Sequence, residues 1–258
     1  MKKIQPILSI ICGIVIIFTL TSCCPTWSQS AQKSRYDLFV EQTTLVKVMT
    51  KAEVVKCEQS KGSSKICKSI LKEFPPLSLR SSGTGTFIDY RKQVHVLTVA
   101  HVCEKEPIPE VMSIDGVTLY VEIKHTITVV RGNFKTNATI IKMDKKNDLC
   151  LLSIDKEPKN VTLPKIASKD PTRGSYVSYA GAPYGMISGT YLVTFSGTFA
   201  GYIGDGFGFS LPCAPGTSGS SIRNEKGEIV SIVQRVIPSF KHMCYGGSTK
   251  SINKFLNY

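Results

Sequence analysis

Residues 214–220 read Ala-Pro-Gly-Thr-Ser-Gly-Ser, which places Ser218 in a glycine-flanked turn of this 258-residue chain. Gly216 permits unusual backbone angles and leaves its own N–H group unobstructed. A serine hydroxyl is a poor nucleophile unless a nearby imidazole takes its proton. The imidazole in turn needs a buried carboxylate that holds one tautomer and stabilises the charged form. A reactive Ser218 therefore requires a histidine and an acidic residue elsewhere in the sequence.

Two upstream segments supply these groups. Residues 97–102 (Leu-Thr-Val-Ala-His-Val) end an apolar strand at His101, and residues 147–152 (Asn-Asp-Leu-Cys-Leu-Leu) open another strand with Asp148. The order His, Asp, Ser is that of one convergent triad, whereas subtilisins and α/β-hydrolases use other orders. Taken singly, the three residues also fit a structural histidine, a turn-capping aspartate and a loop serine. Their joint order and context favours His101, Asp148 and Ser218 as catalytic residues.

Short β-branched and aromatic runs, separated by turn residues, dominate the chain after the N-terminal segment. The predicted strands are 44–48, 86–88, 94–99, 118–123, 126–130, 139–143, 149–154, 176–180, 191–195, 208–211 and 229–236. Such closely spaced short strands predict an antiparallel barrel or sandwich, and periodicity alone does not separate the two. Helices are predicted only at 65–73, in an apparent insertion, and at 251–257.

The chain resembles trypsin-like serine proteases, most closely the protease domain of the bacterial Deg/Htr type, over most of residues 83–255. Residues 83–88 (Gly-Thr-Gly-Thr-Phe-Ile) look like the opening strand of that family, and residues 181–185 (Gly-Ala-Pro-Tyr-Gly) look like its Gly-Asn-Pro-Phe-Gly loop. The histidine, aspartate and serine segments of the family are matched by residues 96–102, 148–152 and 214–220. The resemblance implies an all-β fold of two six-stranded antiparallel barrels with a short C-terminal helix. It also implies an oxyanion hole made by the N–H groups of Gly216 and Ser218.

A stretch rich in Pro, Lys and Asp, near residues 157–174, separates two series of strands. We therefore expect an N-terminal barrel with an inserted loop over residues 37–160, and a C-terminal barrel with the terminal helix over residues 161–258. The chain continues for 40 residues after Ser218, which leaves no room for the peptide-binding domain that Deg proteases append. Thr217 replaces the Asp or Asn of many relatives, which argues against activation by a freed N-terminal amine.

Residues 231–236 (Ser-Ile-Val-Gln-Arg-Val) resemble the strand that pairs with substrate backbone beside the specificity pocket. The predicted substrate-binding residues are Pro212, Gln234, Arg235 and Val236. Val236 aligns where a glycine leaves the pocket of trypsin open, so its branched side chain predicts a short pocket that favours small aliphatic residues before the cut bond. Pro212 stands near the charge-selecting aspartate of trypsins, so cleavage after Lys or Arg is not expected.

The N-terminus carries an export signal. Lys2 and Lys3 precede an apolar run over residues 7–20, as in secretory signals. Residues 20–23 (Leu-Thr-Ser-Cys) resemble the bacterial lipobox, which predicts a signal peptide over residues 1–22, a lipid on Cys23 and a tether over residues 23–36. The alternatives are an ordinary secretory signal and an uncleaved single-span anchor. The predicted location is the cell envelope, as a membrane-anchored lipoprotein on the periplasmic or outer surface.

The exported part of the chain contains six further cysteines besides Cys23 and the leftover Cys24. Cysteines in an exported protein favour disulfides. The family resemblance implies Cys213–Cys244, because trypsin-like enzymes carry a bridge at nearly this spacing. Cys103 and Cys150 each follow a candidate triad residue by two positions and can pair if His101 and Asp148 are adjacent, with a buried free pair as the alternative. Cys57–Cys67 then closes a local loop.

The charge and the cysteine spacing exclude several partners. The formal charge is +13 and falls to +11 without Lys2 and Lys3, but the lysines are scattered, which favours a solvated surface over nucleic-acid binding. No zinc-like spacing is present, and neither a metal nor a cofactor is predicted. The expected function is a serine endopeptidase with an exported or envelope polypeptide as substrate. The alternatives are a catalytically silent protease-fold lipoprotein that binds peptides or partners, and a basic envelope-surface binding protein.

Overall fold

The computed structural model describes residues 34–59, 65–73, 75–105, 107–114, 116–188, 191–237 and 240–257. Almost all of these residues belong to one compact unit, residues 35–258. The predicted signal peptide, the candidate lipidation residue Cys23 and most of the predicted tether lie outside the described residues. The fold described below is therefore that of the unit that begins at Arg35.

The first barrel contains the strands of the N-terminal half. These are β1 (Thr43–Gln59), β2 (Leu77–Tyr90), β3 (Gln93–Thr98), β4 (Val111–Ile114), β5 (Val117–Arg131), β6 (Phe134–Asp144) and β7 (Leu149–Ile154). They run in the order β1-β2-β3-β7-β6-β5-β4, and a further pairing of β1 with β5 closes a ring that leaves β4 outside. Alternate side chains point inward, and Phe87, Leu97 and Leu151 are completely buried there.

The second barrel is closed and contains the remaining strands. These are β8 (Tyr176–Gly181), β9 (Val193–Ile203), β10 (Gly206–Ser210), β11 (Ser221–Arg223), β12 (Ile229–Ile237) and β13 (Phe240–Gly247). Its core is aromatic: Phe199 packs against Phe207 and Phe209 with ring centroids 5.0 and 5.5 Å apart. These contacts bury large apolar rings at the favourable separations of tilted and edge-to-face pairs.

Two helices flank the barrels at the ends of the described chain. Helix α5 (Thr249–Leu256) follows β13, and the Ser248 side chain caps it by accepting a hydrogen bond from Ser251 N. Its apolar face, which includes Ile252 and Phe255, joins the core cluster of the first barrel. Helix α2 (Arg35–Gln42), which the sequence patterns do not predict, precedes β1. The structure confirms the predicted all-β fold of two antiparallel barrels with a short C-terminal helix.

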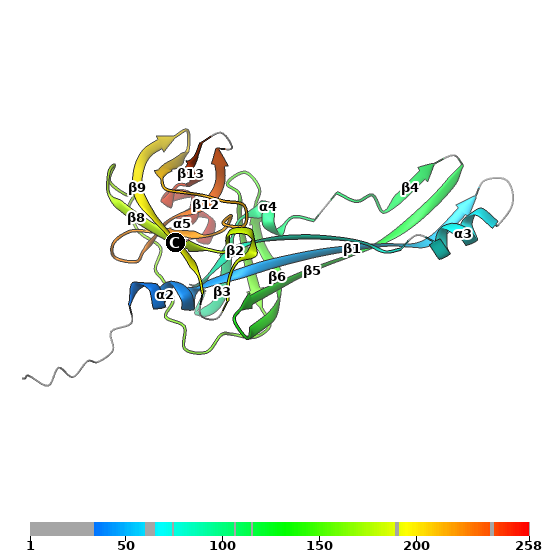
Figure 1. Cartoon of the computed structure of the whole chain (residues 1–258), viewed down its shortest axis with the longest axis horizontal. Helices are drawn as coiled ribbons and strands as arrows, with labels where there is room; N and C mark the ends of the chain where they lie inside the picture. The colour runs from blue at the N-terminus through cyan, green and yellow to red at the C-terminus, as the bar shows by residue number, and fades with distance from the viewer. Residues whose placement is uncertain are drawn as a thin grey trace, which may run out of the picture. The chain divides into compact units, whose positions relative to one another are not determined.

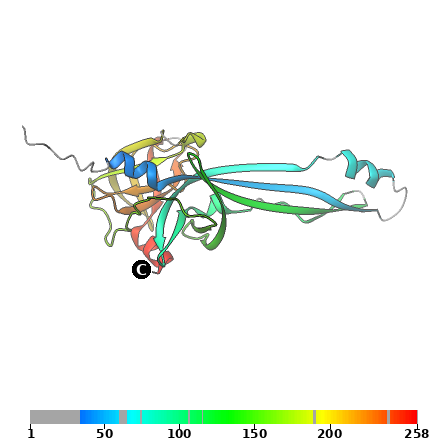
Figure 2. The ribbon, with the colours of Figure 1, turned by 90° about the horizontal axis from the view of Figure 1, so that it is seen from below.

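Strands β1, β2 and β5 extend beyond the first barrel as a long antiparallel projection, which also includes β4 (Figures 1 and 2). We call the described residues between 47 and 82 and between 107 and 127 the arm. Within the arm, β1 lies between β2 and β5, and Ala52 pairs with Leu77 on one side and Ile123 on the other. Helix α3 (Lys65–Glu73), which matches the predicted helix, lies at the outer end.

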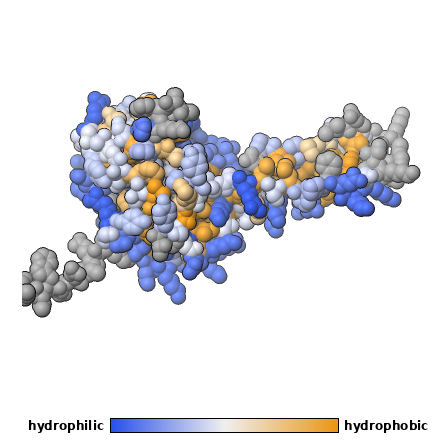
Figure 3. Space-filling model, viewed as in Figure 1, coloured by the Kyte–Doolittle hydropathy of each residue, from blue (hydrophilic) through white to orange (hydrophobic). Residues whose placement is uncertain are grey.

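The arm exposes apolar side chains to solvent. Figure 3 shows apolar surface along it, and its exposed large hydrophobic residues are Val55, Leu71, Leu77 and Val111. Because both faces of the outer arm meet solvent, the alternation of apolar and polar residues that marks a half-buried strand is weak there. This is why the predicted strand over residues 44–48 is much shorter than β1.

The described residues form three disulfides, which join the cysteines that the sequence predicts as pairs. Cys57–Cys67, Cys103–Cys150 and Cys213–Cys244 have Cα separations of 5.4, 6.6 and 5.7 Å. Disulfides persist in oxidising compartments, so they indicate an exported protein. In the described part of the chain, every helix is too short or too polar to cross a membrane.

Candidate active site

His101 and Asp148 lie side by side at one end of the first barrel. His101 belongs to the short helix α4 (Ala100–Cys103) directly after β3, and Asp148 immediately precedes β7. The imidazole Nδ1 lies 2.9 Å from Asp148 Oδ2 and 3.1 Å from Oδ1. The backbone N–H of His101 also donates to Asp148 Oδ1, at 3.0 Å. One carboxylate therefore holds both the ring and the backbone of His101.

The local structure keeps Asp148 ionised. Burial of the carboxyl opposes ionisation, but hydrogen bonds from the His101 side chain and backbone, with the nearby charge of Arg235, outweigh it and lower the pKa of Asp148. Asp148 adopts a φ of +47°, which aspartate tolerates better than most residues. The Cys103–Cys150 disulfide, two residues beyond each partner, ties the two segments together.

Ser218 lies in the second barrel, on the loop between β10 and β11, and contacts the first barrel through its backbone. Its carbonyl accepts a hydrogen bond from Thr84 N at 2.8 Å. The following residue, Gly219, donates its N–H to Val233 O on β12, also at 2.8 Å. A Cβ placed on Gly83 would lie 2.5 Å from Val102 Cγ2 and 2.9 Å from Ser218 O, so the neighbour of His101 and the serine meet across this glycine.

The loop before Ser218 presents two free backbone donors. The N–H groups of Gly216 and Ser218 meet no acceptor among the described residues, whereas the intervening Thr217 N donates to Ala214 O at 3.0 Å. Pro215 O accepts from Tyr184 N at 2.7 Å. Because the C=O and N–H of one trans peptide point in opposite directions, Gly216 N–H points away from Tyr184. Free, fixed donors of this kind are what an oxyanion hole needs.

One contact of a working triad is not formed. Within the described residues, no hydrogen bond joins Ser218 Oγ to the His101 imidazole. The nucleophile–base contact is often long in the absence of substrate and tightens when substrate binds. The structure therefore brings His101 and Asp148 into contact and places Ser218 on the facing barrel, where its carbonyl contacts Thr84 of the first barrel.

Thr84 is a site residue that the sequence motifs do not single out. Its Oγ1 donates to Gly216 O at 2.8 Å and accepts from Ala182 N at 3.0 Å. The Thr84 hydroxyl thus fixes two loops of the second barrel: the loop that carries the candidate oxyanion donors, through Gly216, and the loop that contacts it, through Ala182. The only sequence signal is its place in the Gly-Thr-Gly-Thr stretch of residues 83–86, where either threonine could have this role.

Gln234 and Arg235, on β12, lie next to the cavity that His101 and Asp148 line. Gln234 is buried, and its Nε2 donates to Asn147 O at 2.6 Å, so its side chain supports the Asp148 segment. Arg235 is exposed and lines, with His101 and Asp148, a cavity of about 340 Å³. Both are predicted substrate-binding residues. In the structure, the Gln234 side chain also holds the backbone next to Asp148 through Asn147 O.

The remaining predicted pocket residues lie near the Cys213–Cys244 disulfide. Pro212 O accepts a hydrogen bond from Tyr179 Oη at 2.7 Å, and burial raises the pKa of Tyr179 so that its hydroxyl stays protonated. Val236 pairs with Cys244 and packs, half-buried, against the core of the second barrel. Pro212 thus belongs to one of the two segments that the disulfide joins, and Val236 lies on β12, which pairs with the other, β13.

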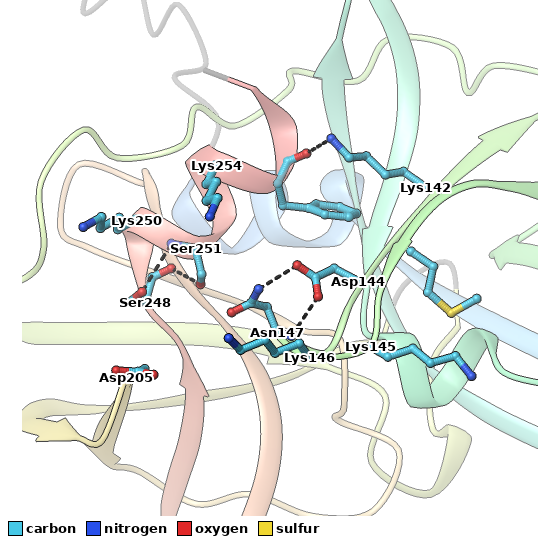
Figure 4. A pocket seen from close by; sticks show the side chains of 12 residues that line it. Lys142, Asp144, Lys145, Lys146, Asn147, Asp205, Ser248, Lys250, Ser251 and Lys254 are labelled. Carbon is cyan, nitrogen blue, oxygen red and sulfur yellow. Dashed lines mark hydrogen bonds between the residues drawn. The ribbon is translucent and has the colours of Figure 1, made fainter.

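The turn that carries Asp148 borders a lysine-lined pocket of about 730 Å³ (Figure 4). Within the turn, Asp144 accepts hydrogen bonds from the backbone and the side chain of Asn147, at 3.0 and 2.6 Å. These bonds fix the carbonyl that Gln234 contacts. Among the described residues, no group of three or more His, Cys, Asp or Glu residues is arranged to hold a metal ion.

The fold and the arrangement of the site define the chymotrypsin-like class. This class has two barrels, with a histidine–aspartate pair on one barrel and a glycine-flanked serine on the other barrel. The chain matches the trypsin-like peptidase domain family over residues 83–232. Because the match spans more than half of the chain, the protein belongs to this family.

Solved structures agree with the fold. The active form of the Rv3671c protease from M. tuberculosis has 16% sequence identity and a TM-score of 0.55, over 84% of this chain and 81% of that chain. An inactive form of the same protease has 16% identity and a TM-score of 0.51, over 81% of this chain and 87% of that one. At such identities the likeness supports the fold alone. No curated protein matches the chain.

Proposed function

We propose that the protein is a serine endopeptidase in which Ser218, His101 and Asp148 form the catalytic triad. The observation that carries the proposal is the Asp148 carboxylate, which holds both His101 Nδ1 and the His101 backbone N–H. Bonding to Nδ1 leaves Nε2 as the proton acceptor of the neutral ring. This is the tautomer that a general base for a serine requires.

The proposed reaction has two halves. Ser218 Oγ bonds to the substrate carbonyl carbon while its proton moves to His101 Nε2, and the N–H groups of Gly216 and Ser218 bind the oxyanion. The C–N bond then breaks, and the proton on His101 passes to the leaving amine, which leaves an acyl-enzyme on Ser218. Water repeats the same steps in the second half, so the acid is released and Ser218 regains its proton.

Labelling with a fluorophosphonate probe tests this proposal. We expect the full chain to be labelled and Ser218→Ala to stay unlabelled at equal folded fraction. His101→Ala should slow labelling by orders of magnitude, because the hydroxyl loses its base. If the folded wild-type chain is not labelled, the missing contact between Ser218 Oγ and His101 favours the second candidate, a protease-fold protein that binds peptides without cleaving them.

The proposed specificity is for small aliphatic residues before the cut bond. The half-buried side chain of Val236 supports it, because it lies beside the Cys213–Cys244 bridge, where the pocket of the resembled proteases opens. Profiling with a peptide library tests it: Val236→Gly should shift the preference towards larger residues. A wild-type preference for Arg or Glu would contradict it.

The proposed setting is the bacterial envelope, with Cys23 carrying the lipid and exported polypeptides as substrates. The lipobox-like residues 20–23 and the disulfides support it, as does the motif resemblance to Deg/Htr proteases. Cys23→Ser should move the protein from the membrane fraction to the soluble fraction. An unchanged membrane fraction would instead support an uncleaved N-terminal span.

A further inference from the structure

Strand β2 has a free edge that leads away from the candidate active site along the arm. Residues 77–86 of β2 pair with β1 on one side, but only residues 86–90 pair with β3 on the other. Among the described residues, no strand therefore pairs with the outer edge of the segment Leu77–Ser82, and all residues of the segment except Leu79 are exposed. Figure 2 shows this strand along the border of the arm, with β1 between it and β5.

The hydrogen bonds of Thr84 show which backbone N–H and C=O groups of β2 point towards its free edge. Thr84 N donates to Ser218 O, and Thr84 O accepts from Thr98 Oγ1, so both groups point away from β1. In an antiparallel strand the outward-pointing residues alternate. Ser82, Arg80 and Ser78 therefore present their N–H and C=O groups on the same edge as Thr84. Among the described residues, these groups have no hydrogen-bond partner.

The free edge is continuous with the site of the proposed reaction. Ser82 lies two residues from Thr84, or roughly 7 Å along an extended strand. Strand β12 lies on the other side of Ser218, where Val233 O accepts a hydrogen bond from Gly219 N. The family resemblance implies that β12 pairs with the substrate residues before the cut bond. A substrate that runs past Ser218 away from β12 thus meets the β2 edge with its leaving-group segment.

The face beside this edge is basic. Lys47, Arg80 and Lys135 are exposed and line a groove of about 500 Å³ together with Ser82 and Thr128. Arg80 belongs to the edge strand itself, so it would be a direct cross-strand neighbour of any added strand. Opposite charges in such positions attract, and like charges repel.

We infer that the leaving-group segment of the substrate adds to β2 as a further antiparallel strand over Ser78–Ser82, and that Arg80, together with Lys47 on the neighbouring strand β1, selects acidic side chains in it. This inference rests on the proposed function and names the substrate class of that site: extended polypeptides with an acidic stretch after the cut bond. An exposed sheet edge is a ready template for strand addition, in which backbone bonds give affinity and side chains give selectivity. From Ser78 to Ser82, the edge spans roughly 13 Å, which matches about five extended residues.

The test measures binding to the uncleaving Ser218→Ala full chain, so it does not depend on turnover. The probe is a fluorescein-labelled decapeptide with Ala-Ala-Pro-Val before the cut and Ser-Glu-Thr-Glu-Thr-Ser after it. Arg80→Pro removes one outward N–H without touching the β1–β2 ladder, because proline is tolerated on the free side of an edge strand. Arg80→Ala is the matched control, since it loses the charge and keeps the N–H.

We expect Arg80→Pro to weaken binding of the decapeptide about tenfold, through the lost backbone bond and charge. Arg80→Ala should weaken it only about threefold. A decapeptide with Lys in place of Glu should bind more weakly than the acidic one to the Ser218→Ala chain. The tetrapeptide Ala-Ala-Pro-Val should bind equally to all three chains.

Equal binding of the acidic decapeptide to the Arg80→Pro and Arg80→Ala chains would refute strand addition. So would a sedimentation measurement in which the wild-type chain is a dimer that Arg80→Pro dissociates, because a second copy would then occupy the edge. Fluorophosphonate labelling of the same variants on the Ser218 background separates this result from the proposed catalysis. Absence of labelling in every chain, the wild type included, would count against the endopeptidase, while the binding data on the Ser218→Ala background would still decide the edge.

Discussion

Gly219 shows how one residue position couples the two barrels. Its φ is +90°, and a Cβ there would lie 2.0 Å from Thr84 O and 2.3 Å from Thr98 Oγ1. Gly174 has a similar φ of +82°, but nothing lies within 4 Å of its Cβ position. An alanine at Gly219 therefore combines backbone strain with a clash across the barrel interface, whereas an alanine at Gly174 brings strain alone.

We expect Gly174→Ala to lower the free energy of unfolding by about 1–2 kcal/mol, the cost of a left-handed side chain. Gly219→Ala should lower it by about 1–3 kcal/mol more, because the clash is with backbone that cannot move aside. Chemical denaturation of both variants measures the difference. Gly219→Ala should also lose fluorophosphonate labelling, and Gly174→Ala should keep it. Equal destabilisation of the two would contradict the close approach of Thr84.

The low pKa of Asp148 predicts how its contribution to stability depends on pH. The folded pKa lies below the unfolded value of about 3.9. The ionised carboxylate therefore stabilises the folded chain above that value, and the stabilisation is lost as the pH falls through the lower folded pKa. The difference in free energy of unfolding between wild type and Asp148→Asn should persist from about pH 7 to pH 5 and shrink as the pH falls below the unfolded value of about 3.9. A gap that closes already between pH 7 and 5 would contradict the assignment.

At the scale of elements, Cys57–Cys67 lies in the arm, whereas Cys103–Cys150 and Cys213–Cys244 lie one in each barrel, and the bridge of the arm has a different setting from that of the first barrel. Cys103 and Cys150 are fully buried and join α4 to β7, in the core of the first barrel. Cys57–Cys67 joins β1 to α3 at the outer end of the arm. A disulfide stabilises the element that it constrains, mainly by restricting the unfolded chain. The two bridges should therefore affect different cooperative units.

We expect Cys103→Ala with Cys150→Ala to lower the global free energy of unfolding by about 2–4 kcal/mol. Cys57→Ser with Cys67→Ser should leave the global midpoint nearly unchanged, because the outer end of the arm, where this bridge lies, is outside both cores, and should raise amide hydrogen exchange in α3. Denaturation followed by exchange mass spectrometry measures both effects. A large shift of the global midpoint on loss of Cys57–Cys67 would show that the arm folds as one unit with the barrel.

Local signals in the sequence predict the barrel strands and the residues of the candidate triad, but not the arm. Apolar runs such as residues 149–154 predict strands clearly, because strands with one or both faces buried have a strong apolar pattern. Residues 51–59 mix lysine, glutamate and valine, and their side chains are mostly exposed. The roles of Thr84 and Gln234 were missed for another reason: their partners, Gly216 and Asn147, are distant in the chain, and a threonine or glutamine alone predicts no contact.

At the scale of the whole molecule, two buried threonines on β2 join the barrels. Thr84 Oγ1 donates to Gly216 O at 2.8 Å, and Thr86 Oγ1 donates to Ser221 Oγ at 2.9 Å. Both side chains are completely buried, so replacing either by valine keeps the shape and removes hydrogen bonds across the interface, two at Thr84 and one at Thr86. Only Thr84 contacts the loop that carries the candidate oxyanion donors.

The two valine variants separate the stability of the barrel interface from the geometry of the oxyanion loop. Thr84→Val should lower the free energy of unfolding by about 1–3 kcal/mol, since it leaves Gly216 O and Ala182 N without their partner, and Thr86→Val should lower it by about 0.5–1.5 kcal/mol, the net contribution of one hydrogen bond. Thr84→Val should in addition slow fluorophosphonate labelling by about tenfold or more, because Gly216 and Ala182 both lose their anchor. Thr86→Val should label at nearly the wild-type rate, since Ser221 keeps its contact with Arg223 Nε at 3.1 Å. If both variants lost labelling in proportion to their stability, the hydroxyl of Thr84 would serve the interface alone, and the active arrangement would be a property of barrel docking as a whole.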